Sequence, residues 1–269
     1  MKNLAKQLVI RPGSRVKLSA MDASDTHGVE KEKAEASLSK VLDRLSVLQY
    51  LLYAEGRRAL LVVLQGIDAA GKDGTIRHVM TGLNPQGVRV TSFKAPEGSE
   101  KRHDYLWRIH RALPEWGQIG IFNRSHYEDV LVVRVHNIVP KSVWSSRYGQ
   151  INDFERMLSQ NNVRIIKFLL YISKEEQAAR FRERLEDKSK NWKFSPADIK
   201  EREYWNQYIA AYDDMLRKCS TPDAPWYVIP ANHKWFRNLA VSEIMRQTLE
   251  SMDLKYPKPA ADLSAIQFE

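Results

Sequence analysis

The stretch from Ala59 to Gly74, which reads ALLVVLQGIDAAGKDG, constrains the fold of this chain more than any other. Its first six residues form a continuous apolar run with many branched side chains, typical of a strand buried on both faces of a parallel sheet. Gly66 and Gly71 then enclose four residues, and Lys72 follows directly. This is the G-x-x-x-x-G-K part of a Walker A loop, in which backbone N–H groups, a helix N-terminus and a lysine surround a phosphate. The stretch therefore predicts a phosphate-binding loop.

The neighbouring sequence supports this interpretation and departs from the standard pattern at one position. A match at three positions arises by accident in a chain of this length on the order of one time in ten, so the loop needs a strand before it and a helix after it. Both are present, because residues 75–81 are compatible with a helix. The residue after Lys72 is Asp73, where a standard loop has the Ser or Thr that ligates magnesium. The alternative is an ordinary turn between a strand and a helix. We predict phosphate contacts from the loop residues Gly66, Ala69, Ala70, Gly71, Lys72, Asp73 and Gly74.

Composition narrows the class of protein. The chain has 269 residues, 43% hydrophobic and 28% charged, as in a globular protein with a substantial core. Its one cysteine, Cys219, excludes an intramolecular disulfide framework. We see no apolar run long enough for a signal peptide or a membrane span, so we expect a cytoplasmic protein. The net charge of +9 favours a polyanionic partner such as nucleic acid, an acidic membrane or a phosphate polymer, although a well-solvated basic surface explains it equally well.

Strands alternate with helices along the rest of the chain. Apolar positions at spacings of three and four predict a helix over residues 30–55. Ser173 and Glu176 form a capping-box pattern at the start of another helix, and Ser195 with Pro196 opens a further one. The predicted strands cover residues 59–64, 88–93, 120–122, 164–172 and 226–229, and the other helices cover residues 75–81, 103–113, 152–160 and 234–252.

This order of elements predicts an α/β fold, a three-layer sandwich in which five parallel strands are covered by helices on both faces. We find no linker or internal repeat and therefore predict one P-loop domain over residues 29–254, with a helical lid over about residues 180–205. Residues 1–28 are expected to form an arm that lies on the domain or on a neighbouring subunit, and residues 255–269 an irregular tail. Ligands of such sheets bind at the carboxyl ends of the strands, so residues directly after the first four strands are candidates for the site.

The segment after the third strand carries the first group of candidates. In kinases with a phosphate loop, an acidic residue usually ends this strand and holds the magnesium shell. Here the strand ends at Asn123, which can ligate or donate but brings no charge. Arg124 follows and faces the same site, and Glu128 and Asp129 come about one turn later. The alternative is a polar loop with a helix cap.

The segment after the fourth strand, residues 180–193, carries six basic and three acidic side chains. Arg180 and Arg184 are four residues apart and share one helix face, where two guanidinium groups could hold one phosphate. Lys193 is a further phosphate-binding candidate. A solvated helix with ion pairs along it is an equal alternative for this segment alone, but next to a phosphate loop we favour a closing lid.

Residues 94–111, after the second strand, are also rich in basic side chains and could line the acceptor site or a polyanion channel. We predict phosphate or nucleotide contacts from Lys94, His103 and Arg108. The histidines at positions 103, 110, 126 and 136 lack the spacing of metal ligands, so we interpret them as polar or core residues.

Several ordered blocks of the sequence resemble the polyphosphate kinase 2 family. They include GIDAAGKDGTIRHVM, SFKAP, HDYLWRIH, GIFNRSHYEDVLVVRVH, ISKEEQAARFRERL, NWKFSP and APWYVIPANHKWFRN. The resemblance covers about residues 10–257 and is specific because so many blocks occur in order. It implies a P-loop kinase core similar to thymidylate kinase, with a lid, and phosphoryl transfer between inorganic polyphosphate and nucleotides. It also implies Mg²⁺ as the cofactor, with Mn²⁺ as an alternative.

The resemblance also implies roles for single residues. Asp68 would help to arrange the metal and the acceptor, Lys72 would contact the transferring phosphate, and Arg124 follows the Walker B position. The lid arginines of the family correspond to Arg180 and Arg184. Many members read Asp-Arg-Ser-Trp-Tyr-Asn-Arg after the third strand, whereas this chain reads Asn-Arg-Ser-His-Tyr-Glu-Asp. That departure looks like the subgroup called class III, which uses both AMP and ADP. It would leave the metal charge to Asp68, Glu128 and Asp129.

Together these features predict in-line transfer of a terminal phosphoryl group from polyphosphate to AMP and ADP, reversibly forming ADP and ATP without a covalent intermediate. The positive net charge would bind the polymer through counterion release, as proteins bind a nucleic-acid backbone. We expect adenine nucleotides as acceptors, with other bases left open, no nucleic-acid or membrane partner, and a homo-oligomer (a dimer or a tetramer). The predicted catalytic residues are Asp68, Lys72, Arg124, Glu128, Arg180 and Arg184.

Two alternatives stay open. An ATP-dependent nucleoside monophosphate kinase would share the fold, the loop and the lid, but it would phosphorylate AMP with ATP and ignore polyphosphate. Asp73 and Asn123 speak mildly against it. A non-catalytic P-loop module that binds nucleic acid would need the basic charge but not the pairing of Asp68 with Glu128.

Overall fold

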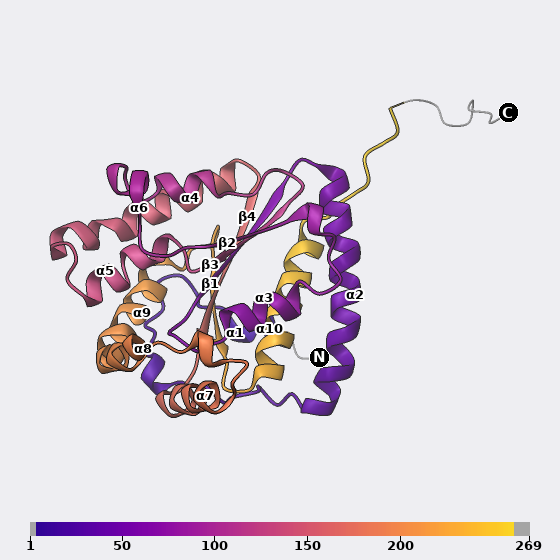
Figure 1. Cartoon of the computed structure of the whole chain (residues 1–269). Helices are drawn as coiled ribbons and strands as arrows, with labels where there is room; N and C mark the ends of the chain where they lie inside the picture. Colours follow the sequence, from indigo (N-terminus) through magenta and orange to yellow (C-terminus); the bar gives the residue numbers. More distant parts are fainter. Residues whose placement is uncertain (1–3, 261–269) are drawn as a thin grey trace.

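The computed structural model describes residues 4–260, and its centre is one sheet of five parallel strands in the order β2-β3-β1-β4-β5 (Figure 1). Side chains of the central strand β1 alternate between two cores: Leu61 and Val63 pack in one, and Leu60, Val62 and Leu64 in the other. Burial on both faces is the property that the apolar run predicts. The strands are β1 (Ala59–Gln65), β2 (Val88–Ser92), β3 (Ile119–Asn123), β4 (Val163–Tyr171) and β5 (Trp226–Pro230).

Helices cover both faces of the sheet (Figure 1). One face carries α1 (Leu4–Leu8), α2 (Lys31–Glu55), α3 (Lys72–Val79) and α10 (Lys234–Ser251). The opposite face carries α4 (Trp107–Arg111), α5 (Val132–Val135), α6 (Lys141–Gln160) and α9 (Trp205–Cys219). The predicted three-layer α/β sandwich is therefore confirmed. The predicted lid segment begins within α7 (Lys174–Glu186), at the lower edge of Figure 1, and includes α8 (Pro196–Glu201), which is labelled below α9.

Three local predictions differ from the structure. The helix expected over residues 152–160 is α6, which begins at Lys141, because apolar contacts of Trp144 and Tyr148 outweigh the weak helix propensity of this segment. The helix expected over residues 103–113 shortens to α4, since Asp104 accepts a hydrogen bond from the backbone of Leu106 and forms a turn there.

The capping box at the start of α7 forms only in part. Ser173 Oγ accepts from the backbone of Glu176 at 3.1 Å, as predicted. The carboxylate of Glu176 instead accepts from Arg180 Nε at 2.7 Å, and the backbone N–H of Ser173 donates to Asn232. Asn232, which is distant in the sequence, thus accepts the hydrogen bond that Glu176 would accept in a complete capping box.

The first described residues pack on the domain. Leu4, Leu8 and Leu18 are buried, and the backbone N–H of Ile10 donates to Trp226 O at 2.8 Å on the β5 edge of the sheet. The predicted arm (1–28) and tail (255–269) reach beyond the described part of the chain at residues 1–3 and 261–269. Between residues 4 and 260, no helix is both long and apolar enough to cross a membrane.

Candidate active site

A cavity of about 530 Å³ opens where the phosphate loop, the end of β3, the lid segment and the start of α10 meet. Many of the predicted residues line it, and several basic side chains that were not predicted join them. The predicted residues are Asp68, Ala69, Gly71, Lys72, Asp73, Gly74, Asn123, Arg124, Arg180, Arg184 and Lys193; the additional basic ones are Arg77, His78, Lys190, Lys234 and Arg237. The carboxyl edge of the sheet therefore holds a strongly cationic cavity around the loop.

The backbone of the loop explains why glycine stands at both ends. Gly66 has a φ of 156°, and a Cβ atom there would lie 2.8 Å from Leu170 O. Gly71 has a φ of 102°, and a Cβ there would lie 2.0 Å from Arg237 Nη1. Lys72 begins α3, and its Nζ donates to Gly66 O at 2.6 Å. Glycine at position 66 is therefore required by the close approach of the Leu170 backbone, and glycine at position 71 by its positive φ.

The two departures from the standard P-loop pattern are bonded to each other. Asn123 Nδ2 donates to Asp73 Oδ1 at 2.6 Å. An aspartate at position 123 would place a second carboxylate against Asp73 and repel it, whereas the amide donates to it. Asp73 in place of a hydroxyl and Asn123 in place of an acid thus form one compatible pair.

Arg124 is held in an unusual backbone conformation beside the loop. Its φ is 63°, its backbone N–H donates to Leu64 O at 3.0 Å, and its Nη2 donates to Asp68 Oδ1 at 2.8 Å. Strained residues of this kind cluster at functional sites, where the surrounding structure holds them. The ion pair fixes the guanidinium over the loop.

Of the three predicted metal carboxylates, the structure brings two together. Asp68 and Glu128 line a second cavity of about 260 Å³ beside the loop, and Glu128 Oε1 accepts from Gln65 Nε2 at 2.9 Å. Asp129 lies in neither cavity, because it turns away and accepts from Arg147 Nη1 at 2.8 Å. Burial raises the pKa of Asp129 to about 6 although Arg147 opposes the shift. Asp129 therefore does not lie with Asp68 and Glu128, and the structure gives no support to its predicted role as a metal ligand.

The donor set around the loop suits a magnesium ion that arrives with its substrate. Among residues 4–260, no group of three or more His, Cys, Asp and Glu side chains is placed to hold a metal ion. The nearby carboxylates are each paired, Asp68 with Arg124 and Glu128 with Gln65. Mg²⁺ often takes only one or two protein carboxylates and completes its shell with water and substrate phosphates. The residues present therefore fit such an ion, and Asp68 and Glu128, which line one cavity, are the carboxylates that could hold it.

The two predicted lid arginines have different surroundings. Arg180 is buried and donates to the carbonyl oxygens of Ala69 (2.8 Å), Ala70 (3.0 Å), Ala231 (2.6 Å) and Asn232 (3.1 Å) as well as to Glu176. Its five N–H groups are thereby all used, two of them on the loop backbone. Arg184 Nη1 lies 3.6 Å from Asp198 Oδ2 and lines the cavity. The structure thus gives Arg180 a supporting position, in place of the paired phosphate grip that the four-residue spacing suggests.

Comparison with known proteins identifies the family of this chain. Residues 28–257 match the family model described as polyphosphate kinase 2. The chain belongs to the polyphosphate kinase 2 family. It is 50% identical over 266 residues to the AMP/ADP-polyphosphate phosphotransferase of Meiothermus ruber, covering 98% of this chain and 100% of that protein. It is 46% identical over 271 residues to the ADP-polyphosphate phosphotransferase of Rhodopseudomonas palustris, covering 96% and 94%. The crystal structure of polyphosphate kinase 2 from Arthrobacter aurescens matches with a TM-score of 0.94 at 42% identity, covering 98% of this chain and 95% of that one.

In this member of the polyphosphate kinase 2 family, Arg237 is the main cavity residue that sequence reasoning missed. It is 3% exposed, and within residues 4–260 its guanidinium donates hydrogen bonds only to Asn238 Oδ1. Burial and the neighbouring Arg180 lower its pKa to about 10. Arg237 has no carboxylate partner among residues 4–260, so a bound anion would offset its buried charge. Arg237 lies inside α10, beyond the residues that directly follow β5, so the rule that places ligands at strand ends does not predict it.

Three predicted contacts of the polyphosphate kinase 2 site lie outside both cavities. Arg108 is buried and donates to Lys94 O at 2.7 Å and to Glu100 Oε2 at 3.3 Å. The ring of His103 stacks on Trp107 with centroids 4.0 Å apart. Lys94 and Arg108 line a separate groove beside β2. The structure does not bring Lys94, His103 and Arg108 together with the phosphate loop.

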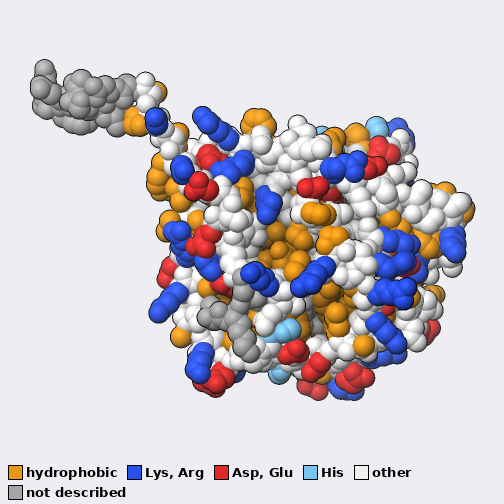
Figure 2. All heavy atoms as spheres, turned by 180° about the vertical axis from the view of Figure 1, so that it is seen from behind, with side chains coloured by type: hydrophobic (Ala, Val, Ile, Leu, Met, Phe, Trp, Pro, Cys, Tyr) orange, Lys and Arg blue, Asp and Glu red, His pale blue; other side chains and the backbone are white. Residues whose placement is uncertain are grey.

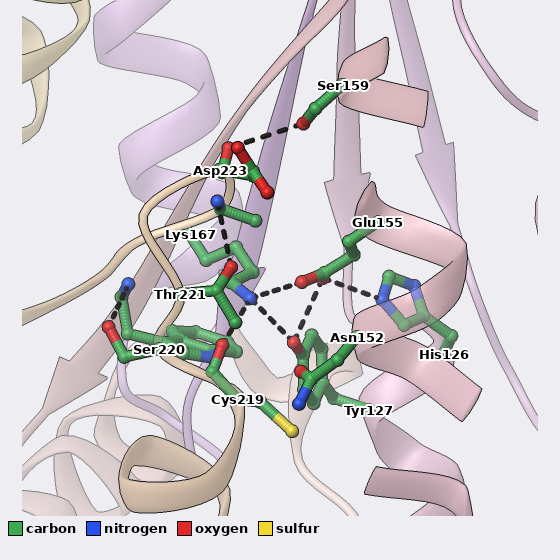
Figure 3. A network of polar contacts seen from close by, with 12 residues as sticks. His126, Tyr127, Asn152, Glu155, Ser159, Lys167, Cys219, Ser220, Thr221 and Asp223 are labelled. Carbon is green, nitrogen blue, oxygen red and sulfur yellow. Dashed lines mark hydrogen bonds and ion pairs between the residues drawn. The ribbon is translucent and has the colours of Figure 1, made fainter. Parts of the chain in front are cut away.

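A buried ionic network anchors the segment that carries Arg124 and Glu128 (Figure 3). Lys167 Nζ donates to Glu155 Oε2 at 2.5 Å, to Tyr127 OH at 2.7 Å and to Cys219 O at 2.8 Å. Glu155 Oε1 accepts from Tyr127 OH at 2.9 Å and lies 3.1 Å from His126 Nε2. These contacts connect β4 and α6 to residues directly between Arg124 and Glu128. His126 is therefore a core residue, as its sequence context suggests.

Basic side chains form no single continuous patch on the face of the molecule that is drawn in Figure 2. On the face shown in Figure 2, basic and acidic side chains are intermingled over the whole outline. The cavity around the loop, in contrast, collects Arg77, Arg184, Lys193, Lys234 and Arg237 within one concave site. Part of the positive surplus is thus concentrated at the candidate active site, and part is ordinary surface charge.

Proposed function

We propose that this chain transfers the terminal phosphoryl group of inorganic polyphosphate to AMP and ADP, reversibly forming ADP and ATP. The observation that carries the proposal is the cationic cavity around the phosphate loop, in a chain that belongs to the polyphosphate kinase 2 family. The relatives from Meiothermus ruber and Rhodopseudomonas palustris match over nearly their full length, and their names as AMP/ADP- and ADP-polyphosphate phosphotransferases support the donor and the acceptors.

The proposed chemistry is positioning and charge neutralisation. Lys72, Arg124 and Arg237 converge on the loop, where they would hold the phosphates of donor and acceptor in line. Lys72 is tethered to Gly66 O and can exchange that contact for a phosphate oxygen. The bond to Asp68 keeps the guanidinium of Arg124 oriented while the charge on the transferring group spreads. No nucleophilic side chain is needed for such a displacement.

We further propose Mg²⁺ as the cofactor, with Mn²⁺ as an alternative, held by Asp68 and Glu128. The metal would neutralise phosphate charge when bound. A homo-oligomer, a dimer or a tetramer, is also proposed, supported by the exposed apolar side chains of Val47, Tyr50 and Tyr53 along α2. A cytoplasmic location is proposed from the single buried cysteine, and we propose neither a nucleic-acid nor a membrane partner.

The decisive experiment is to incubate the pure protein with AMP, and separately with ADP, in the presence of polyphosphate and Mg²⁺. Formation of ADP and ATP without added ATP is the expected result. A parallel reaction contains AMP, ATP and Mg²⁺ but no polyphosphate. Turnover only in that second reaction would identify an ATP-dependent nucleoside monophosphate kinase and contradict the proposal.

The metal ligands can be distinguished by two isosteric substitutions. We expect Asp68→Asn to lower kcat on the order of 100-fold and to raise the Mg²⁺ concentration needed for half-maximal rate. Asp129→Asn should keep kcat within about threefold and leave the Mg²⁺ dependence unchanged, because this carboxylate lines neither cavity and is paired with Arg147. The measurement is a Mg²⁺ titration of initial rates. Equal losses in the two variants, with equal thermal stability, would place Asp129 among the ligands instead.

A further inference from the structure

A second, larger cavity lies beside the edge strand β2 and takes no part in the proposed reaction. It measures about 760 Å³ and is formed by β2, the following turn of residues 98–102 and α4. Arg89, Lys94 and Arg111 contribute its basic side chains. We call it the β2–α4 groove.

The three cations of the groove are unpaired, whereas its acids are engaged. Arg89, Lys94 and Arg111 are exposed, and within residues 4–260 their side chains make no hydrogen bond or ion pair. Glu100 accepts from Arg108 at 3.3 Å and from the backbone of Glu97 at 3.3 Å. Glu97 in turn accepts from the backbone of Glu100. Free positive charge in a concave site attracts an anionic ligand.

The aromatic side chain of the groove favours phosphate over nucleotide bases. Trp107 already stacks on His103 at 4.0 Å with an interplanar angle of 11°, and the guanidinium of Arg111 lies 4.7 Å from its ring centroid. Sites for single-stranded nucleic acid need free aromatic faces on which bases can stack. Here the ring of Trp107 already contacts His103 and Arg111, and it holds the guanidinium of Arg111 in place.

The groove adjoins the active-site cavity at the ends of two neighbouring strands. Ser92 at the end of β2 pairs in register with Asn123 at the end of β3, and Phe93 N donates to Asn123 O at 3.0 Å. Ser92 lines the groove and Asn123 lines the cavity around the loop. Neighbouring strands are only about 4.8 Å apart, so an extended polyanion can pass from one site to the other. The outer edge of β2 has no strand partner within residues 4–260, so its backbone N–H groups are further potential donors.

We propose that the β2–α4 groove binds the part of a long polyphosphate chain that extends beyond the active site, so that the enzyme prefers long donors over short ones. This inference rests on the proposed function, because it extends the binding of the same donor. Affinity would increase with chain length until the polymer spans both sites, since each additional phosphate contact releases counterions.

The test is the double variant Arg89→Gln/Arg111→Gln, assayed with long-chain polyphosphate and with tetrapolyphosphate. We expect the KM for the long chain to rise about tenfold, and the slope of log KM against log salt to fall by about 2, one for each lost contact. The KM for tetrapolyphosphate, the KM for AMP and kcat should stay unchanged. A matched control, Lys31→Gln/Lys40→Gln, removes the same charge from α2 on the opposite face of the sheet and should change none of these values. An equal rise of KM for both chain lengths, or no rise, would overturn the inference.

Direct binding separates this inference from the proposed function. The Kd of long-chain polyphosphate is measured without acceptor, beside that of a single-stranded RNA of similar charge. If the groove variant loses affinity for polyphosphate and the control variant does not, the groove binds the polymer, even if the protein shows no turnover. A protein that turns over polyphosphate but loses equal affinity for both polymers would have a general polyanion or nucleic-acid site there, which contradicts the proposed specificity.

Discussion

Replacing Lys72 by methionine is expected to lower kcat/KM for phosphoryl transfer by a factor on the order of 10²–10³. The ammonium group lies at the start of α3, where Nζ donates to Gly66 O at 2.6 Å and to Ile67 O at 3.4 Å. A phosphate at the loop would replace these carbonyls and draw the positive charge toward the transferring oxygens. Methionine keeps an unbranched apolar side chain, one atom shorter than lysine, and removes the ammonium with its charge and its hydrogen bonds. Initial rates with AMP and polyphosphate measure the loss directly.

The pH dependence of kcat/KM gives this prediction a second measurement. Burial, together with the nearby Arg124, lowers the pKa of Lys72 from its ordinary 10.5 to about 8. In the free enzyme the ammonium is therefore lost as pH rises through about 8, and kcat/KM should decline above that pH. The Lys72→Met variant should lack this decline.

Stability distinguishes the loss of charge from misfolding. The unfolded lysine has the higher pKa, so between pH 8 and 10.5 the unfolded state binds more protons and stability rises with pH. Below that range the folded state carries the full cost of the buried ammonium. Lys72→Met should thus not lower the melting temperature at pH 7. Lys33→Met, at an exposed position on α2, is the control for removal of one lysine charge. A Lys72→Met variant that keeps wild-type rates would show that the loop binds its phosphate without the lysine.

Replacing Lys167 by methionine is expected to destabilise the fold by about 3–5 kcal/mol. Lys167 and Glu155 are 0% and 1% exposed, and the substitution would leave the carboxylate buried without its cation. Burial lowers the pKa of Lys167, and Glu155 counteracts that shift. Although burial alone would raise the pKa of Glu155, Lys167 and His126 hold it below its ordinary value. The 2.5 Å contact of Lys167 Nζ with Glu155 Oε2 is the ion pair that the substitution breaks, and urea unfolding at pH 7 measures the cost.

A double variant, Glu155→Met/Lys167→Met, tests whether the unpaired charge is the cause. Removing both charges should recover part of the lost stability, because apolar residues of similar size often replace a buried ion pair at little cost. Recovery should stay incomplete, since Tyr127 OH and Cys219 O lose their partner Lys167. The exposed pair of Lys33 with Glu30 is the control, and Lys33→Met should change stability by less than about 0.5 kcal/mol. A double variant less stable than Lys167→Met alone would show that the ion pair itself stabilises the fold.

Local patterns predict the elements that bear on the active site. The run from Ala59, the glycines of the loop and the cap at Ser173 depend on neighbouring residues alone, and the structure confirms each of these elements. The helix over residues 141–160 was underestimated because its stability comes from side chains that pack on the sheet, which propensity does not contain. Arg237 escaped notice for a related reason. Its importance comes from burial beside Arg180, about 57 positions earlier in the chain, and no short-range pattern records that contact.

The sequence by itself determined the loop, the parallel sheet and the set of charged residues at its carboxyl edge. These follow from periodicity, glycine and strand order, which act over short stretches of chain. Only the tertiary structure decided which of those residues bond to one another. Asn123 bonds to Asp73, and Asp68 orients Arg124. Arg180 supports the loop, and Asp129 pairs with Arg147. Each of these side chains has several possible partners of suitable charge in the sequence. Which partner it contacts depends on differences of a few ångströms between segments that are far apart in the sequence, and the packing of the two cores sets those distances.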